Sequence, residues 1–130
     1  MKKNKKTFIA TLIILVCVLF AACFLVNKPE TQQINSIDVS LIEDGVYTGE
    51  CDNKLVKAGV EVQVEDGRIT NIKILEHENG LGSKAETIVN RVIQGQTLNV
   101  DAVTGATYSS NTILKAIENA LHQGEKEVNL

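Results

Sequence analysis

A decapeptide in the C-terminal third of the chain concentrates hydroxyl groups, glycine and alanine where a helix is about to begin. Residues 101–110 are Asp-Ala-Val-Thr-Gly-Ala-Thr-Tyr-Ser-Ser, and an amphipathic pattern follows them. The free N–H groups and the dipole of a helix N-terminus favour an anion such as phosphate. Gly105 and Ala106 leave room for a bulky group near the backbone. The alternative is an ordinary loop, with Gly105 in a turn and Ser109 or Ser110 as the helix N-cap, and the decapeptide alone favours it.

The other residue types exclude most enzyme chemistries. The chain has two histidines, His77 and His122, and His122 falls in the expected last turn of a helix, where it suits the helix dipole. Cys17 and Cys23 lie inside an apolar run, and Cys51 is expected to be a half-buried strand residue. No Ser-His-Asp arrangement, metal site, disulfide framework, GxGxxG fingerprint or P-loop is predicted. A stand-alone hydrolase or dehydrogenase is therefore not expected.

Short strands precede the decapeptide. Residues 45–49 form a short candidate strand, and residues 59–64 alternate strictly, with three valines on one face. Asp66 and Gly67 give a strong turn signal, and residues 69–75 follow as the returning strand. These segments predict an antiparallel meander.

Helices are expected after the strands. Ser83 and Glu86 have the spacing of a capping box, and apolar residues at helical spacing continue to a stop at Gly95. A second helix is expected from about residue 109 to residue 121, with one apolar face. Strands followed by helices indicate the α+β class, here a small antiparallel β-meander with two helices packed on one face.

In this setting the decapeptide resembles a known motif. Residues 101–107 are similar to Asp-x-x-(Ser/Thr)-Gly-Ala-Thr, the flavinylation motif of the FMN-binding domain family. That family includes the flavin subunits of sodium-translocating NADH:quinone reductases and Rnf-type complexes. Residues 45–49 resemble the family's opening strand and residues 60–69 its central hairpin. Residues 76–82 resemble its glycine loop, although Asn79 stands where many members carry Thr-Pro.

The resemblance implies FMN as the cofactor. In the family the last Thr of the motif, here Thr107, can carry FMN through a phosphoester bond made by a separate flavin transferase that uses FAD. The transferase would supply the chemistry, so this chain needs no base for it. His77 and Glu78 are expected to be solvated loop residues. The implied cofactor-binding residues are Thr107, Thr104, Gly105, Ala106, Asp101, Ser109, Gly80, Leu81 and Gly82.

The resemblance also implies roles for several of these residues. Thr104 and Ser109 would hydrogen-bond the phosphate. Asp101 would shape the loop or mark it for the transferase, or would act only as a turn residue that bonds its own backbone. Gly80 and Gly82 would lie against the isoalloxazine ring, or would merely turn the chain into the next helix.

The N-terminus has the pattern of a membrane anchor. Residues 8–26 contain one polar residue, Thr11, and four lysines precede them. At 1.5 Å per residue this run spans roughly 28 Å, about the thickness of bilayer hydrocarbon. A single-pass helix with a cytoplasmic N-terminus is predicted. The alternative is a lipoprotein signal ending at Cys23, although Phe20 stands where such signals usually carry Leu. Both place residues 27–130 outside the membrane.

The expected organisation has four parts. Residues 1–26 form the cytoplasmic basic tail and anchor, and residues 27–43 form a polar linker that contains a proline. Residues 44–122 form the FMN-binding domain, and residues 123–130 a charged tail.

Charge and size restrict the function. Beyond Val26 the chain holds nine basic and sixteen acidic residues, a balance of −7, which repels nucleic acid. A domain of about eighty residues does not also enclose a large substrate pocket. The expectation is an extracytoplasmic electron carrier at the cell membrane, between a membrane donor and an extracytoplasmic acceptor, rather than a stand-alone enzyme. The alternative is a non-redox assembly or surface module with the same fold.

Overall fold

The computed structural model describes residues 3–26, 33–78 and 83–126 of the chain. The chain divides into two compact units, Met1–Glu30 and Thr31–Leu130. Each unit is described by itself.

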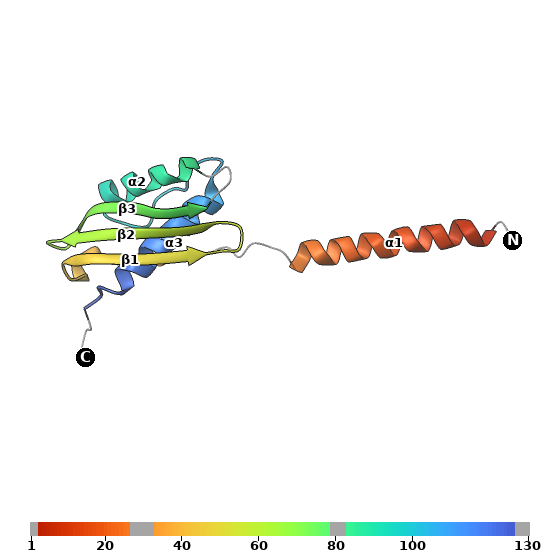
Figure 1. The fold of residues 1–130 in the computed structure, drawn as a ribbon, viewed down its shortest axis with the longest axis horizontal. Helices are drawn as coiled ribbons and strands as arrows, with labels where there is room; N and C mark the ends of the chain where they lie inside the picture. The colour runs from red at the N-terminus through yellow and green to blue at the C-terminus, as the bar shows by residue number, and fades with distance from the viewer. Residues whose placement is uncertain (1–2, 27–32, 79–82, 127–130) are drawn as a thin grey trace. The chain divides into compact units, whose positions relative to one another are not determined.

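The first unit contains one helix, α1 (Lys3–Val26) (Figure 1). Its segment Asn4–Cys23 is long and apolar enough to cross a membrane, with a mean hydropathy of 2.4. A signal sequence near an N-terminus has the same properties. The hydroxyl of Thr11 donates to the carbonyl of Phe8 at 2.9 Å, so the single polar side chain of the apolar run is satisfied within the helix.

The second unit is built on a three-stranded antiparallel sheet (Figure 1). The strands are β1 (Gly45–Asp52), β2 (Lys57–Glu65) and β3 (Arg68–Glu78), in the order β1-β2-β3. This arrangement confirms the predicted meander. Cys51, expected to be half-buried, is buried in β1 with 8% of its surface exposed.

The turn and the core face of the sheet follow from the residue pattern. Asp66 and Gly67 have φ values of 51° and 69°, as a type I′ turn between β2 and β3 requires. The three alternating valines of β2 are fully buried: Val60, Val62 and Val64. Their burial fixes the register of β2, because a slip by one residue would turn all of them toward solvent.

Strand β3 departs from simple alternation. Its pairing with β2 shifts by one residue near the turn. Gln63 pairs with Asn71 and Val64 pairs with Ile69, so Thr70, which lies between the two partners, has no paired residue on β2. This bulge brings Ile69 and Ile72 to the core face, although they are three positions apart.

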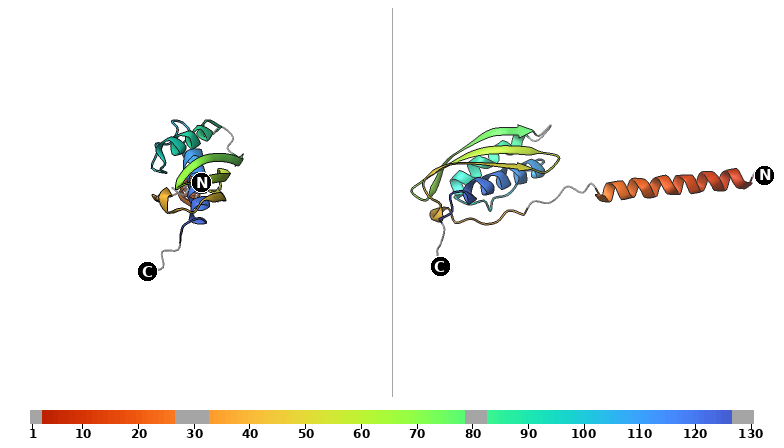
Figure 2. Two further views of the ribbon diagram at one scale, coloured as in Figure 1. Left: turned by 90° about the vertical axis from the view of Figure 1, so that its left-hand side faces the viewer. Right: turned by 60° about the horizontal axis from the view of Figure 1, so that its bottom comes forward.

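Two helices cover one face of the sheet (Figure 2). Helix α2 (Ile88–Gly95) packs on β3, and α3 (Thr107–His122) packs on β1 and β2. The approach of α3 is close at Gly49, where a Cβ would overlap the Ala116 carbonyl oxygen and lie 2.9 Å from the Cβ of Ala120. The predicted α+β class, with both helices on one face, is confirmed.

The first helical segment begins differently from the prediction. A 3₁₀ helix, Ser83–Thr87, precedes α2, and Thr87 at the α2 N-cap makes no side-chain capping bond. The predicted capping box is therefore wrong. The Glu86 carboxylate lies 3.1 Å from His77 Nδ1 instead, because a partner on the sheet is within its reach.

The end of α2 also differs. Gly95 is the last helical residue, and the left-handed C-cap is Gln96, with φ of 52°. The Gln96 side chain accepts from the Ile69 N–H at 2.7 Å and donates to the Ile69 carbonyl at 2.9 Å. These bonds join α2 to the start of β3 and explain why a residue other than glycine holds this conformation.

The segments that flank the sheet and helices belong to the folded unit. Three residues of the expected linker are buried in the core: Ile37, Val39 and Ile42. Glu43 N–H donates to the Gly124 carbonyl at 2.8 Å, and Ile42 forms a bridge with Glu125. The compact unit thus begins before residue 44 and continues beyond residue 122, because apolar residues without regular spacing still pack on the core.

Candidate functional site

Helix α3 begins at Thr107, two or three residues earlier than predicted. Ala106 is at the N-cap without a side-chain capping bond, so the assignment of Ser109 or Ser110 as N-cap is wrong. Gly105, just before it, has φ of 79°, and a Cβ there would meet nothing within 4 Å. Glycine is favoured at position 105 by its backbone conformation, and the space in front of it is open.

Burial separates the hydroxyls of the motif into two classes. Thr104 and Thr107 are exposed, whereas Ser109 is 4% exposed and Ser110 is fully buried. Ser110 Oγ accepts from the Val103 N–H at 3.0 Å, which holds the loop against the helix. Of these hydroxyl groups, only the two threonines are open to a reagent from outside.

The backbone at the start of α3 presents donors. The first intrahelical bond runs from Ser110 N–H to the Ala106 carbonyl at 2.9 Å. The N–H groups of Thr107, Tyr108 and Ser109 therefore precede the helical ladder, and they carry the positive end of the helix dipole. Ser109, with its hydroxyl buried, contributes a backbone N–H here.

An arginine that the sequence did not single out fixes the start of the motif. Arg91 on α2 donates from Nη1 to the Asp101 carbonyl at 2.6 Å. The Asp101 residue itself is exposed. Arg91 and Asp101 lie on different elements, and no local pattern in the sequence joins them.

The turn between β1 and β2 is fastened to the first turns of α3. Asn53 Nδ2 donates to Thr112 Oγ1 at 2.7 Å in a buried contact, and Thr112 Oγ1 donates to the Tyr108 carbonyl at 2.8 Å. Two apolar side chains remain exposed at these elements, Leu55 (65%) and Tyr108 (49%). Figure 1 shows the start of α3 at the end of the sheet where β1 and β3 finish.

His77 and Glu78 are not loop residues. Both lie in β3, and the His77 side chain is 2% exposed, so the expectation of a solvated loop histidine is wrong. The expected glycine-loop residues Gly80, Leu81 and Gly82 lie outside the described residues, and their placement at the flavin stays a prediction.

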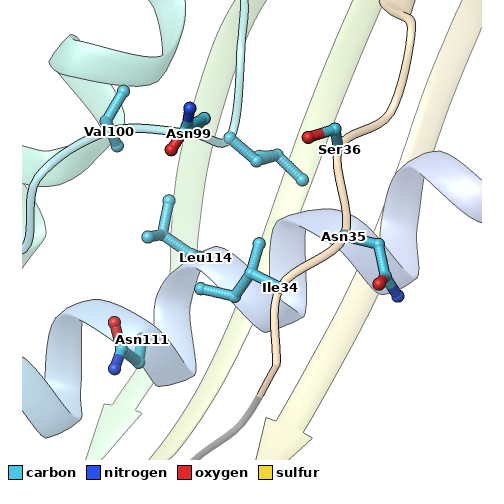
Figure 3. A pocket seen from close by; sticks show the side chains of 8 residues that line it. Ile34, Asn35, Ser36, Asn99, Val100, Asn111 and Leu114 are labelled. Carbon is cyan, nitrogen blue, oxygen red and sulfur yellow. The ribbon is translucent and has the colours of Figure 1, made fainter.

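A small cavity lies beside α3 (Figure 3). Its volume is about 150 Å³, and Asn111, one helical turn after Thr107, contributes to its wall. Pockets that enclose a drug-sized ligand measure about 300–1,000 Å³, so this cavity does not enclose a flavin ring. The lining residues are Ile34, Asn35, Ser36, Leu98, Asn99, Val100, Asn111 and Leu114. Among the described residues, no group of three or more His, Cys, Asp or Glu side chains is placed to hold a metal ion.

These features fit the phosphate end of FMN. A phosphate at Thr107 would meet the N–H groups that precede the helical ladder, and the open space at Gly105 admits it without a clash. Thr104 would lie on the same exposed loop. Asp101 carries a negative charge, so it suits a role in shaping or marking the loop rather than in contacting phosphate.

Known proteins share this part of the chain. A model of the FMN-binding domain matches residues 56–122, just over half of the chain. Urocanate reductase of Eggerthella lenta is 35% identical over 78 residues, which are 58% of this chain and 13% of that protein. NADH:acrylate oxidoreductase of Vibrio harveyi is 34% identical over 65 residues, which are 48% of this chain and 6% of that protein. The match to the FMN-binding domain, with a reductase and an oxidoreductase among the relatives, supports a redox role carried by FMN. The chain therefore belongs to the FMN-binding domain family, and its cofactor is FMN.

Proposed function

We propose that FMN is joined covalently to Thr107 through a phosphoester and that the chain is a membrane-held electron carrier. The observation that carries the attachment is the position of Thr107: an exposed hydroxyl on the first residue of α3, beside free backbone donors. The bound flavin supplies the exchange of electrons, and the protein supplies its position and electrostatic surroundings.

Different residues of the chain bind the phosphate of the cofactor and position the loop that carries it. The N–H groups of Thr107, Tyr108 and Ser109 stabilise the negative charge of the phosphodiester, and Gly105 leaves room for it. Arg91 keeps the loop in place through the Asp101 carbonyl. Forming the ester is assigned to a separate flavin transferase.

His122 ends α3, at the far end of the helix from Thr107, so it does not act as a base for the Thr107 hydroxyl. His77 lies on β3, and its Nδ1 is 3.1 Å from Glu86. We assign the activation of the Thr107 hydroxyl to the flavin transferase rather than to this chain.

The role of electron carrier is consistent with the small cavity that the described residues form beside α3. At about 150 Å³, this cavity does not hold both a flavin ring and a substrate. The chain spans 13% and 6% of the two relatives, whose names describe reductases. We infer that this chain passes electrons between a membrane donor and a separate extracytoplasmic acceptor.

The membrane and its sidedness are part of the same proposal. The apolar segment Asn4–Cys23 is compatible with a single-pass anchor, and the lysines before it favour a cytoplasmic N-terminus. A covalent bond would keep the cofactor on a domain outside the cell, where a dissociated flavin is lost.

The test is the mass of the full chain produced beside a flavin transferase. We expect one added FMN on the wild-type protein, none on Thr107→Ala, and an unchanged addition on Thr48→Ala, a matched change at an exposed threonine of β1. Fluorescence of the denatured protein band checks the bond independently. Attachment that survives in Thr107→Ala and is lost in Thr104→Ala would contradict the assignment. A wild-type protein without any flavin would instead favour a non-redox module.

A further inference from the structure

The side chain of Tyr108 has no role in the attachment proposed above, which involves only its backbone N–H. Tyr108 follows the acceptor Thr107 directly, and 49% of its surface is exposed although it is aromatic. Within the part of the chain that the structure describes, its hydroxyl makes no hydrogen bond with another residue. Its carbonyl accepts from Thr112 Oγ1, so the backbone that carries the ring is fixed.

General helix geometry indicates on which side of the helix start the Tyr108 ring lies. In an α-helix the Cα–Cβ bonds tilt toward the N-terminus, so a residue covers the surface over the turn that precedes it. Tyr108 is the second residue of α3, and the segment that precedes it is the motif loop with Gly105 and Thr107. We therefore expect the phenol ring on the loop side of the helix start.

The folded unit has one other aromatic side chain, Tyr47. All three phenylalanines lie in the apolar N-terminal run, and the chain has no tryptophan. Tyr47 serves the fold: its hydroxyl donates to the Glu43 carbonyl at 2.8 Å, and its ring lies against Gly124. It is near the start of β1, whereas the start of α3 lies at the end where β1 finishes (Figure 1).

We propose that the isoalloxazine ring of FMN carried by Thr107 rests on the phenol ring of Tyr108. This inference rests on the attachment proposed above. Offset stacking buries aromatic surface that is otherwise exposed. The β1–β2 turn, which Asn53 joins to Thr112 of α3, carries a second exposed apolar side chain, Leu55. A ring held in this way keeps one face open, as exchange of electrons with a separate protein requires.

Stacking on tyrosine gives a specific optical signature. A phenol in van der Waals contact donates an electron to a photoexcited flavin and takes it back as the excitation decays, with no net chemistry. The Tyr108 contact therefore shortens the fluorescence lifetime of the flavin. A phenylalanine ring stacks equally well but is too difficult to oxidise, so the two effects can be separated.

The experiment compares Tyr108→Phe, Tyr108→Leu and the wild type, all as full chains carrying FMN, purified in detergent and checked by mass. We expect a several-fold longer flavin lifetime in both variants. We also expect the rise in Tm that FMN gives the protein to be kept in Tyr108→Phe and to be about twofold smaller in Tyr108→Leu. The Tm of each variant without FMN shows whether the substitution itself alters the fold, and Tyr47→Phe is the matched control that keeps the wild-type lifetime.

Equal lifetimes in the wild type and both Tyr108 variants would overturn the stacking while leaving the attachment at Thr107 intact. A flavin lifetime that lengthens in Tyr47→Phe but in neither Tyr108 variant would place the ring at the other end of β1 and would overturn the stacking as well. Absence of FMN from Thr107 in the wild-type mass would remove both the proposed function and this inference.

Discussion

At the scale of single residues, Gly49 and Gly105 are needed for different physical reasons. Gly105 has φ of 79° and faces open space, so its requirement lies in the backbone. Gly49 lies in the regular strand β1, and glycine is needed there because the Ala116 carbonyl and Ala120 already fill the space that a Cβ would occupy. The first glycine shapes the loop at the cofactor site, and the second sets how closely α3 approaches the sheet.

Gly49→Ala is expected to destabilise the domain by about 3 kcal/mol, the upper part of the range for overpacked cores. The added methyl would overlap backbone atoms of α3, which do not yield as a flexible side chain does. The free energy of unfolding in urea measures this loss. Gly59→Ala in β2 is the control, because its Cβ would lie at an ordinary 3.6 Å from the Cβ of Glu76. We expect that control to be neutral or to gain about 0.5 kcal/mol, and a Gly49→Ala protein as stable as Gly59→Ala would show that α3 shifts without cost.

Sequence patterns predicted the features of the site that depend on neighbours along the chain. The motif at residues 101–107 and the position of Gly105 before a helix are local signals, although the helix start was predicted two or three residues too late. Contacts between distant segments have no such signal. Arg91 reaches Asp101 from another helix, and Asn53 reaches Thr112 from the turn between β1 and β2.

Burial also reversed two local readings. Ser109 and Ser110 look like N-cap residues by type, yet the fold encloses both and uses the Ser110 hydroxyl to hold Val103. Likewise, Ile37 and Ile42 stand in a segment without periodicity, but they complete the core. Residue type singled out the two serines but not the two isoleucines, and in both cases packing between distant segments decided the role.

At the scale of elements, a buried carboxylate joins α3 to the segment that precedes the sheet. Glu118, with 1% of its side chain exposed, accepts from Asn35 Nδ2 at 2.9 Å and from Lys115 Nζ at 3.0 Å. His122 Nε2 lies 3.4 Å from the same carboxylate, and His122 Nδ1 lies 3.0 Å from Glu125. The network therefore ties the flanking segments on both sides of the domain to one helix.

The pKa shifts in this network have opposite directions. Burial by itself raises the pKa of Glu118, but the hydrogen bonds from Lys115 and Asn35 together outweigh burial and hold that pKa below its ordinary value. The hydrogen bond to Glu125 raises the pKa of His122, and its effect is larger than the opposing effect of burial. A weaker hydrogen bond to Glu118 raises this pKa further.

These directions predict how stability depends on pH. The contribution of Glu118 is complete above its unfolded pKa of about 4.3 and is lost as pH falls through the lower folded pKa. The contribution of His122 is complete below its unfolded pKa of about 6.5 and is lost as pH rises through the higher folded pKa. Together they favour maximum stability between about pH 4.3 and about pH 6.5.

Urea unfolding of two variants across this range checks the prediction. Glu118→Gln should flatten the acid side of the stability profile, and His122→Gln should flatten the neutral-to-alkaline side. Each variant is the control for the other, because they act on opposite sides. If Glu118→Gln left the acid side as steep as in the wild type, the buried carboxylate would not be the group that titrates there.

At the scale of the whole molecule, the two units differ in charge and polarity. The first carries lysines and an apolar helix, and the second carries a large excess of acid. Positive charge beside a spanning helix stays on the cytoplasmic side, and the domain is then expected outside. A cofactor attached on that side would meet acceptors that a cytoplasmic flavoprotein does not reach.

Labelling with a membrane-impermeant maleimide tests this orientation in intact protoplasts. Thr48→Cys, exposed on β1, should react without lysis, whereas Asn4→Cys near the N-terminus should react only after lysis. Both changes are made with Cys17 and Cys23 replaced by alanine. The native Cys51 can remain, because burial raises its pKa and keeps its thiol from reacting quickly. Reaction of Asn4→Cys before lysis with protection of Thr48→Cys would reverse the orientation. Fatty-acid labelling that depends on Cys23 in the otherwise native chain would replace the spanning helix with a lipid anchor, while the domain would stay on the same side.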